Sequence, residues 1–484
     1  MWNARRFYSG LFVISLTACG GGGSGGDDSN GGGGGGVVPP TNTSPVLDFV
    51  GDQQLFEGTS DPISTLSATD ADGDALSFSL TGSDVAFFEI SDELALIPKE
   101  PFDFEVPSDD AEGNIYEITI TVSDGADSDS ETILITVLNA LEGRVVDGPI
   151  SGSTVTVSTG NSPETDTPVA TDEDGYWQVT EEFSEDSELQ VTASGGVDTS
   201  TGKDLSNLVL VSDVPAGGVG SINVNAITTI LSVVDTPEEK AAILAALGIE
   251  GSPDELIGTD IWDAASSGDE EAQAAQRVNA QLNLIILTTQ TIIAGATGDA
   301  FDPASSVLAV VGAIVEAIAE SESIKLESSD VVAEVITASA IAAAPGVEVS
   351  AEVIEAVAEA VADNNTLLGD ESVDPTSDTA AGISAAGQDE LQGAVEDVST
   401  GRTDISEFGE QTDPEALYED VPVDNDASDA DGDGLVDTID PDDDNDGVRD
   451  GEDAFPLDSA EAFDTDGDGV GNNTDTDDDG DGAL

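Results

Sequence analysis

The sequence predicts a multidomain chain with two all-β antiparallel sandwiches, an α-helical bundle and an irregular repeat arm. Three observations lead to this fold class. Short runs that alternate apolar and polar residues recur between residues 46 and 222, as half-buried strands do. Residues 223–365 change to Ala, Ile, Leu, Val and Glu with helical periodicity. Residues 424–484 are rich in Asp at fixed spacings and poor in apolar side chains.

The charge of the chain restricts its partners. Its 484 residues carry 102 Asp and Glu against 10 Lys and Arg, with no His, for a formal net charge of −92. This balance argues against binding to nucleic acid and against docking on anionic membranes through charge. Carboxylates are ligands for hard cations, of which Ca²⁺ is the first candidate. High charge also keeps a protein soluble.

The composition also restricts catalysis. Without His the chain has no Ser-His-Asp or Cys-His nucleophile and no His-bearing zinc site. A hydrolase with two carboxylates stays formally open, but no spacing singles out a pair. Aromatic residues make up 4% of the chain, which disfavours a sugar-stacking cleft, and the single Cys excludes an intrachain disulfide. We therefore expect that the protein is not an enzyme.

Residues 1–18 have the features of a secretory signal peptide, because two arginines precede an apolar run too short to span a bilayer. The tetrapeptide Leu16–Cys19 resembles the bacterial lipobox, in which the Cys is lipidated. The resemblance implies cleavage before Cys19 and a lipid anchor. Gly20 follows rather than Asp, which points to the outer membrane of a Gram-negative bacterium. We expect the protein at the cell surface, with an orientation towards the periplasm as the alternative. An ordinary signal peptide that contains Cys is the alternative.

Residues 19–45 connect the lipidation position to the first predicted domain. Positions 20–36 hold 12 glycines among 17 residues, a composition that cannot bury a core. We expect a flexible tether with a root-mean-square reach of about 25–30 Å. It would hold the first domain away from the lipid surface.

Residues 46–140 are predicted to form a sandwich of about seven strands. The motifs follow in the order Phe56-Glu57-Gly58, Asp70-Ala-Asp72-Gly-Asp74, Asp103-Phe104-Glu105 and a last strand pattern before Asp124-Gly125. This order resembles a cadherin-like repeat. In that family an early Glu and an Asp-x-Glu pair bind Ca²⁺ at one pole, and an Asp-x-Asp pair binds it at the other.

The cadherin-like resemblance implies calcium ligands at both poles of this sandwich. At one pole they are Glu57, Asp103 and Glu105, and at the other Asp70 and Asp72. The acidic linker that completes the family's site is missing, since only Leu138-Asn139-Ala140 follows the last strand, and there is one repeat rather than an array. A solvated Asp-Gly turn without metal is the alternative.

Residues 141–222 predict a second β-sandwich. Residues 153–158 alternate cleanly, and residues 171–179 read as a turn followed by an aromatic strand. The segment resembles the prealbumin-like, Ig-like sandwich of carboxypeptidase regulatory-like domains, which implies a spacer without activity. Asp172 and Asp174 are interpreted as turn residues.

Residues 223–365 predict an α-helical domain packed beside the second sandwich. Ser329, Asp330 and Ser350 are expected N-caps and Gly248 a C-cap. No constellation marks a ligand pocket. Residues 366–423 are expected to be an acidic linker with one helix near 388–395. The helices expected in the bundle are 237–247, 270–293, 305–320, 329–343 and 350–363.

The segment 424–484 carries the motif with the clearest chemistry. The pattern Asp-x-Asp-x-Asp-Gly-x-x-Asp-x-x-Asp starts at Asp429, recurs 13 residues later and recurs again after 22 more, with Asn at its ninth position. A fourth, incomplete copy begins 13 residues further on. Acids at positions 1, 3 and 5 converge, Gly at position 6 permits the sharp turn, and the carbonyl of position 7 with positions 9 and 12 completes the oxygen shell that Ca²⁺ prefers.

These registers define the candidate calcium ligands of the arm. Those of the first copy are Asp429, Asp431, Asp433, Leu435, Asp437 and Asp440. Those of the second copy are Asp442, Asp444, Asp446, Val448, Asp450 and Asp453. The third and fourth copies supply Asp464, Asp466, Asp468, Val470, Asn472, Asp475, Asp477, Asp479 and Asp481.

The loops resemble EF-hand loops without flanking helices. Their 13–22 spacing and the insert 455–458 resemble thrombospondin type 3 repeats. That resemblance implies an irregular calcium-wrapped arm with almost no hydrophobic core, unfolded without metal. An acidic disordered tail is the alternative, although it does not explain the in-register glycines.

Together these features predict a calcium-binding cell-surface lipoprotein that acts in adhesion or as a structural spacer. The alternative is a calcium-dependent module that binds polysaccharide or peptide, for which Trp177 and Trp262 are the only tryptophans after the signal peptide. The expected partners are Ca²⁺, a membrane through the lipid anchor, and a protein or polysaccharide surface, with no nucleic acid.

Overall fold

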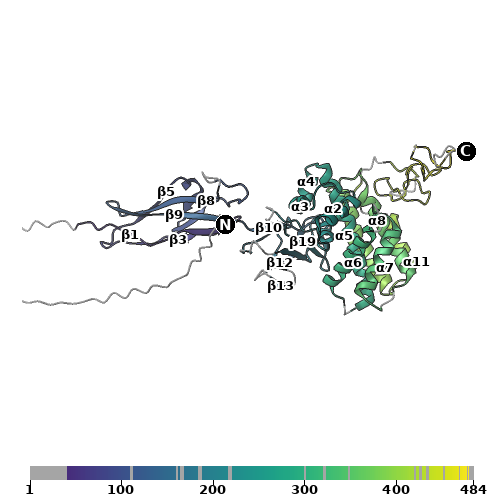
Figure 1. Ribbon diagram of the computed structural model, residues 1–484, viewed down its shortest axis with the longest axis horizontal. Helices are drawn as coiled ribbons and strands as arrows, with labels where there is room; N and C mark the ends of the chain where they lie inside the picture. Colours follow the sequence, from purple (N-terminus) through teal and green to yellow (C-terminus); the bar gives the residue numbers. More distant parts are fainter. Residues whose placement is uncertain are drawn as a thin grey trace, which may run out of the picture.

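The computed structural model describes residues 41–484 apart from 109–112, 160–161, 164–167, 182, 184–187, 216–220, 299–300, 320–322, 347–348, 419–420, 424–427, 432–434, 451–452, 468, 477 and 479–484. The predicted signal peptide, Cys19 and the tether up to residue 40 lie outside this range. Figure 1 shows an elongated molecule. The N-terminal sheets, a second group of sheets, the helices and the C-terminal arm follow one another along its long axis.

Residues 46–138 form the first sandwich. One sheet has the order β2-β9-β8-β5 and the other β3-β7-β6, while β1 pairs with β4. Buried residues alternate with less buried ones along β8 and in the second half of β9, as the sequence pattern predicts. The elements are β1 (Val46–Leu47), β2 (Gln53–Phe56), β3 (Ser64–Thr65), β4 (Ala68–Thr69), β5 (Ser77–Thr81), the 3₁₀ turn η1 (Val85–Phe87), β6 (Phe88–Ile90), β7 (Ala95–Pro98), β8 (Ile115–Ser123) and β9 (Ser128–Leu138).

An aromatic cluster fixes the loop between β7 and β8 on this sandwich. Tyr116 of β8 is completely buried, and its ring centroid lies 4.5 Å from that of Phe102 and 5.9 Å from that of Phe88. Phe102 belongs to the loop between β7 and β8. Burying its ring in the core therefore fixes the backbone that carries the next residues, Asp103 and Glu105.

One strand pair departs from the expected antiparallel pattern. β2 runs parallel to β9, with Gln53 opposite Ile135 and Phe56 opposite Leu138. The prediction of an all-antiparallel sandwich is wrong at this edge, because the first long strand and the last strand run towards the same pole. The residues after β2 and after β9 therefore end side by side, and the Glu57 N–H donates to the Leu138 carbonyl at 3.0 Å.

A second group of sheets occupies residues 141–213. Its sheets have the orders β13-β12-β16-β19 with β14 beside β12, β11-β17-β18, and β10-β15. The Asp172 carboxylate accepts the N–H groups of Asp174 and Tyr176 at 3.0 and 2.9 Å, which confirms the predicted turn. The strands are β10 (Leu141–Arg144), β11 (Ile150–Ser151), β12 (Thr154–Thr159), β13 (Ser162–Pro163), β14 (Val169–Ala170), β15 (Tyr176–Val179), β16 (Leu189–Ser194), β17 (Val197–Asp198), β18 (Lys203–Asp204) and β19 (Val209–Asp213).

Helices follow from residue 226 to residue 417. The five predicted helices are present. Ser350 is the N-cap residue of α8, whereas Ser328 occupies this position in α7, so the expected N-caps Ser329 and Asp330 lie inside the helix. Neither Ser350 nor Ser328 makes a side-chain capping hydrogen bond. No helix among the described residues has the length and apolar character needed to span a bilayer. The helices are α1 (Ala226–Leu231), α2 (Pro237–Ala246), α3 (Pro253–Gly258), α4 (Ile261–Ser266), α5 (Glu270–Thr297), α6 (Pro303–Ala319), α7 (Ser329–Ala343), α8 (Ala351–Gly369), α9 (Asp378–Ala386), the π-helical turn η3 (Gly387–Leu391), α10 (Gln392–Ser399), α11 (Ile405–Gln411) and α12 (Pro414–Leu417).

The segment 366–423 is folded, so the prediction of an acidic linker there is wrong. Helices from the end of α8 to α12 occupy much of it, and α10 packs on α5 and α8. Ile383, Leu391 and Val395 are completely buried. The apolar residues are sparse among polar ones, but they recur at intervals that place them on one helical face. In α10 this face packs against α5 and α8.

The second sandwich, the helices and the beginning of the arm share one hydrophobic core. Buried side chains form a single cluster that includes Val155 of β12, Ile286 of α5 and Leu391 of η3. Leu435 and Ile439 of the arm belong to the same cluster, 7% and 5% exposed. The segments 141–222 and 223–365 thus pack as one unit, and we call residues 141–423 the body. The resemblance to thrombospondin type 3 repeats implies an arm with almost no hydrophobic core, but the beginning of the arm packs into the core of the body.

Scarce bases join parts of the body that are distant in the sequence. Arg144 of β10 is 4% exposed, and its Nη1 lies 3.1 Å from Asp260 and 2.7 Å from Asp263. Its guanidinium also lies 4.6 Å from the centre of the Tyr176 ring. The guanidinium is buried although the two carboxylates are partly exposed, so removal of both acids would leave an uncompensated buried charge.

A buried pair of carboxylates lies where the second sandwich meets η3. Asp147 and Asp198 are 4% and 1% exposed, and the Nε2 group of Gln388 donates to both, at 2.8 and 3.1 Å. Thr201 donates to the Oε1 atom of Gln388 at 2.7 Å, which orients the amide. Burial, followed by the charge of Asp198, raises the pKa of Asp147 from 3.8 to about 8.

Leu391→Ala should lower the free energy of unfolding of the body by about 2–5 kcal/mol, because the side chain is fully buried and its loss leaves a cavity. Urea denaturation followed by circular dichroism measures this. Glu390→Ala, next to it and exposed, is the control. Equal losses in the two variants would contradict the packed position of this segment.

Asp147→Asn should flatten the dependence of stability on pH. The folded Asp147 holds its proton up to about pH 8, whereas the unfolded carboxyl loses it near 3.8, so this group makes the body less stable as the pH rises between these values. The slope is up to about 1.4 kcal/mol per pH unit. We expect the variant to lose that slope in denaturation series at pH 5–8. An unchanged slope would show that Asp147 is ionised in the folded body.

Candidate functional site

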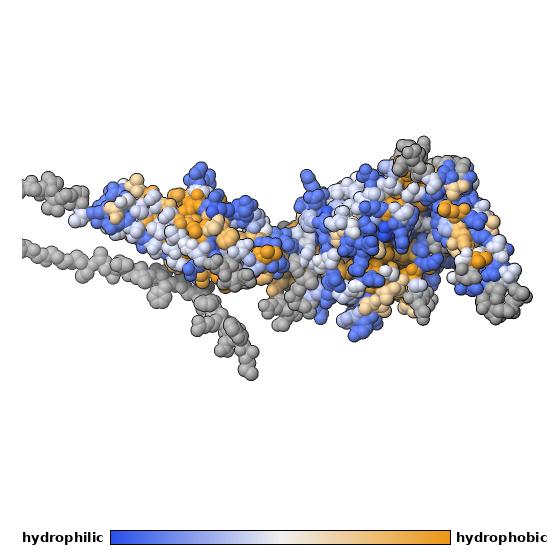
Figure 2. All heavy atoms as spheres, turned by 90° about the horizontal axis from the view of Figure 1, so that it is seen from above, coloured by the Kyte–Doolittle hydropathy of each residue, from blue (hydrophilic) through white to orange (hydrophobic). Residues whose placement is uncertain are grey.

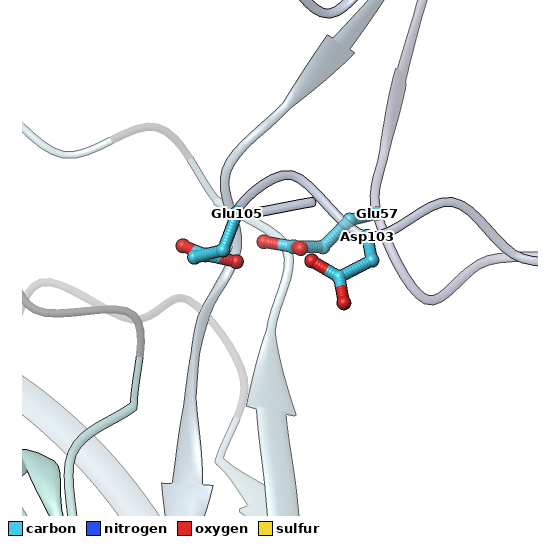
Figure 3. Close-up of side chains that lie close together, drawn as sticks. All are labelled: Glu57, Asp103 and Glu105. Atoms are coloured by element: carbon cyan, nitrogen blue, oxygen red, sulfur yellow. The ribbon is translucent and has the colours of Figure 1, made fainter. Parts of the chain in front are cut away.

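Three carboxylates meet where the first sandwich joins the second. Glu57 directly follows β2, and Asp103 and Glu105 lie in the loop that Phe102 fixes. Figure 3 shows the three side chains pointing toward one another, and one carboxylate oxygen from each lies within 4.8 Å of the others. The structure therefore brings together the three residues that the sequence placed at this pole.

Backbone N–H groups hold Glu57 in place. Its side chain is 3% exposed; its Oε1 accepts from Ala140 at 2.8 Å and its Oε2 from Phe104 at 2.7 Å. These two donors come from the interdomain linker and from the acidic loop. Each carboxylate oxygen retains a lone pair for a further partner, which a cation can use.

The linker and the second sandwich also contribute polar groups. The Asn139 side chain donates to Glu105 at 2.9 Å. Gln178 of β15 donates to the Glu57 carbonyl at 3.3 Å and to the Glu142 carboxylate at 2.9 Å. Glu142 belongs to β10 and was not among the predicted ligands. A search for acids just after Asn139 would have found it, since the next strand begins at once.

The electrostatics of this junction favour a bound cation. Partial burial, then the charge of Glu57, raises the pKa of Glu105. Burial, then the charges of Glu57 and Asp103, raises the pKa of Glu142. No ion pair among the described residues involves these four acids. Closely spaced carboxylates without a basic partner repel one another, and a divalent ion with oxygen ligands removes that repulsion.

The opposite pole carries Asp70, Asp72 and Asp74, whose ligand atoms also lie within 4.8 Å of one another. One Asp70 oxygen accepts the N–H groups of Asp72 and Asp74 at 2.9 and 3.0 Å, so the tight Asp-Gly turn is present. The other Asp70 oxygen is buried without a hydrogen-bond partner. The turn and a metal site are thus compatible here. Asp74 was not among the predicted ligands.

The three described copies of the arm motif share one backbone arrangement. In each, the side chain at position 9 accepts the N–H of position 2: Asp437 from Ala430 at 2.8 Å, Asp450 from Asp443 at 3.0 Å and Asn472 from Thr465 at 2.9 Å. The glycines at position 6 have positive φ in the second and third copies, +94° at 447 and +86° at 469. A repeated, glycine-dependent loop is therefore present rather than a featureless acidic chain.

The second copy assembles its acids most completely. Asp442, Asp444 and Asp446, at positions 1, 3 and 5, have ligand atoms within 4.8 Å of one another. One oxygen each of Asp442, Asp444 and Asp453 is buried and lacks a hydrogen-bond partner. Burial is the first cause that raises the pKa of these three carboxyls, and the neighbouring acids add to it. This arrangement suits a Ca²⁺ ion.

The other predicted arm ligands divide into two groups. Asp464 accepts from the N–H groups of Gly467 and Gly469, both at 2.8 Å, as position 1 of a loop should. Val448 and Val470 lie in their loops, and Asp429, Asp431, Asp466 and Asp475 are also among the described residues. Those outside the described residues are Asp433, Asp468, Asp477, Asp479 and Asp481.

Four acids of the arm, three of them predicted loop ligands, also lie against the body. Asp437, Asp440, Asp443 and Asp450 line a cavity between the arm and the helices of the body. Burial, then the neighbouring charges with Asp370 of the body among them, raises the pKa of Asp443 to about 8 and that of Asp450 to about 7. Asp443 occupies position 2 of its copy, a position to which the loop pattern gives no role.

Comparison with solved structures finds a similarity to cadherins. The crystal structure of human protocadherin-24 EC1-2 matches at 15% identity with a TM-score of 0.18, over 38% of this chain and 99% of that one. Drosophila N-cadherin EC1-4 matches at 16% identity with a TM-score of 0.19, over 36% of this chain and 49% of that one. No protein-family model and no curated protein matches the chain.

Glu142→Gln should raise the unfolding temperature of the sandwiches in EDTA by about 2–5 °C, because it removes one repelling charge and keeps a carbonyl oxygen for Gln178. In saturating Ca²⁺ the same change should lower the unfolding temperature. Scanning calorimetry measures both. Glu173→Gln, an exposed acid of the second sandwich, should have no such opposite effects. A shift of the same sign with and without Ca²⁺ would contradict a shared cation site.

Proposed function

We propose that this chain is a calcium-binding, non-enzymatic protein of the cell surface that acts as a spacing or adhesive element. The observation that supports the proposal most directly is the convergence of Glu57, Asp103 and Glu105, with Glu142 beside them, at the joint between two sandwiches. The chain supplies these acids from both sides of the joint. An ion bound among them would link the two units.

Calcium at this joint would act on the shape of the molecule. Figure 2 shows a narrow waist between the first sandwich and the body. Without an ion, the repulsion between acids of the two units favours opening of the joint. With an ion, the same acids hold the units together, and the molecule becomes a stiff rod. A stiff rod suits a protein that presents a module at a distance from the cell surface.

The location of the protein belongs to the same proposal. The resemblance of residues 16–19 to a lipobox and the Gly-rich tether support a lipid-anchored protein of the outer membrane. No observation favours the alternative of a polysaccharide-binding module. Trp177 is 3% exposed and so cannot form a stacking platform. Trp262 lines a cavity of about 20 Å³, which is too small for a sugar.

Calorimetric titration of the full chain with Ca²⁺ tests the joint. The double variant Asp103→Asn with Glu105→Gln should bind at least one ion fewer than the native chain and lose the calcium-dependent rise in the unfolding temperature of the first sandwich. The affected Kd should lie at about 10⁻⁴–10⁻³ M, the range of extracellular modules.

The matched control is Asp92→Asn with Glu93→Gln, an exposed pair of acids in the same sandwich. It should bind as many ions as the native chain. If both double variants and the native chain bind the same number of ions with the same stabilisation, the joint is not a calcium site and the proposal fails.

A further inference from the structure

A cavity of about 480 Å³ lies between the arm and the body. The body contributes residues of α5 and α8 and the loop after α8, and the arm contributes residues from Asp437 to Pro456. The arm is held at this place by its own contacts. Arg449 pairs with Asp363 of α8 and lies 3.7 Å from Glu359, and Leu435 and Ile439 insert into the core of the body. Figure 1 shows the arm beside the helices at the C-terminal end.

The lining of the cavity is strongly acidic. Its one base is Arg277, whose Nη2 group donates to the Glu371 and Val373 carbonyls at 3.3 and 3.2 Å rather than to a carboxylate. The docked arm thus adds carboxylates to a body surface that already carries them. The lining acids are Glu327, Asp370 and Glu371 of the body and Asp437, Asp440, Asp443 and Asp450 of the arm.

Two deeply buried acceptors in the lining have no donor. Asp443 is 9% exposed, and its Oδ1 atom has no hydrogen-bond partner. Asn365 of α8 is completely buried, and its Oδ1 atom likewise has none. The Asn365 amide is oriented by its Nδ2 group, which donates to the Leu326 carbonyl at 2.8 Å, so a flip of the amide would set two acceptors against each other. Asp443 and Asn365 both line the cavity, and a positive or donating group bound there would partner these two acceptors, which have no donor from the protein.

We propose that this cavity is a Ca²⁺ site that docks the arm on the body. The acceptor set is all oxygen, which suits a hard divalent cation. The cavity has space for more than ten water molecules at about 30 Å³ each, so the ion keeps part of its hydration shell and bridges the walls partly through water.

This site shares Asp437, Asp440 and Asp450 with the loop registers but adds groups that lie outside them. Asn365 and Asp370 belong to the body, and Asp443 stands at position 2 of its copy. The N–H and the hydroxyl of Ser372 donate to the carboxylate of Asp370, both at 2.7 Å, which fixes its position in the lining of the cavity. The inference depends on the proposed function only in the choice of ion, and the docking itself is a separate claim.

Asp370→Asn is the principal test, because Asp370 lies in no arm register and its substitution leaves the loops intact. Asp443→Asn is the second variant, from the opposite wall. Glu355→Gln, an exposed acid of α8 that does not line the cavity, is the control with the same loss of charge. All are made in the full chain, with Cys19→Ser to remove the only native thiol.

Spin labels on cysteines introduced at Ile341→Cys of the body and Leu457→Cys of the arm report the docking, since these positions are 66% and 64% exposed. Pulsed electron resonance measures the distance between them, and equilibrium dialysis counts bound Ca²⁺. In the native chain and the control we expect a single narrow distribution of distances in Ca²⁺ and a broad one in EDTA. In Asp370→Asn and Asp443→Asn we expect a broad distribution in Ca²⁺ and at least one ion fewer.

The outcomes separate the two proposals. If the native chain takes up Ca²⁺ but both variants keep the narrow distance and the native ion count, docking by calcium is overturned while calcium binding elsewhere stands. If the native chain takes up no Ca²⁺ at all, both proposals fail. If spermine narrows the distribution of distances and Ca²⁺ does not, the cavity is a site for an organic polycation and the metal site is overturned.

Discussion

Repulsion among carboxylates is the constraint on which the rest of this structure depends. A chain with a formal net charge of −92 can be compact only where each cluster of acids is balanced or neutral. Three devices serve this end. Arg144 and Arg449 connect distant segments, and burial beside Asp198 raises the pKa of Asp147, which favours its neutral form. The acids at the sandwich joint take part in no ion pair among the described residues, which leaves a cation to balance them.

Local patterns in the sequence predicted the local structure well. Alternation indicated the strands that form β8 and β12, the 3.6-residue period indicated α5 to α8, and the Asp spacing indicated loops whose glycines have positive φ. Each of these depends on neighbours within one or two turns of chain. The segment 366–423 was predicted wrongly as a linker because its apolar residues are sparse, and only the surface of α5 and α8 makes their helical face stable.

Local patterns could not predict which residues from distant segments come together in the sites. Glu57, Asp103 and Glu105 were named through a family resemblance, and the structure places them together. Glu142, Asn365 and Asp443 were not named, since each acquires its role only from a partner across a domain boundary. The parallel pairing of β2 with β9 was also missed, because nothing in the strand residues distinguishes a parallel edge from an antiparallel one.

That parallel pairing has a mechanical consequence. The chain enters the first sandwich at β1 and leaves it after β9, at the pole where Glu57 meets Ala140. A pull on the two ends therefore draws β2 backwards along its own axis and β9 forwards along its axis. The hydrogen bonds between β2 and β9 are then loaded in shear. They share the force, so they must fail together rather than open one by one. A sandwich built in this way is suited to bearing tension along the rod.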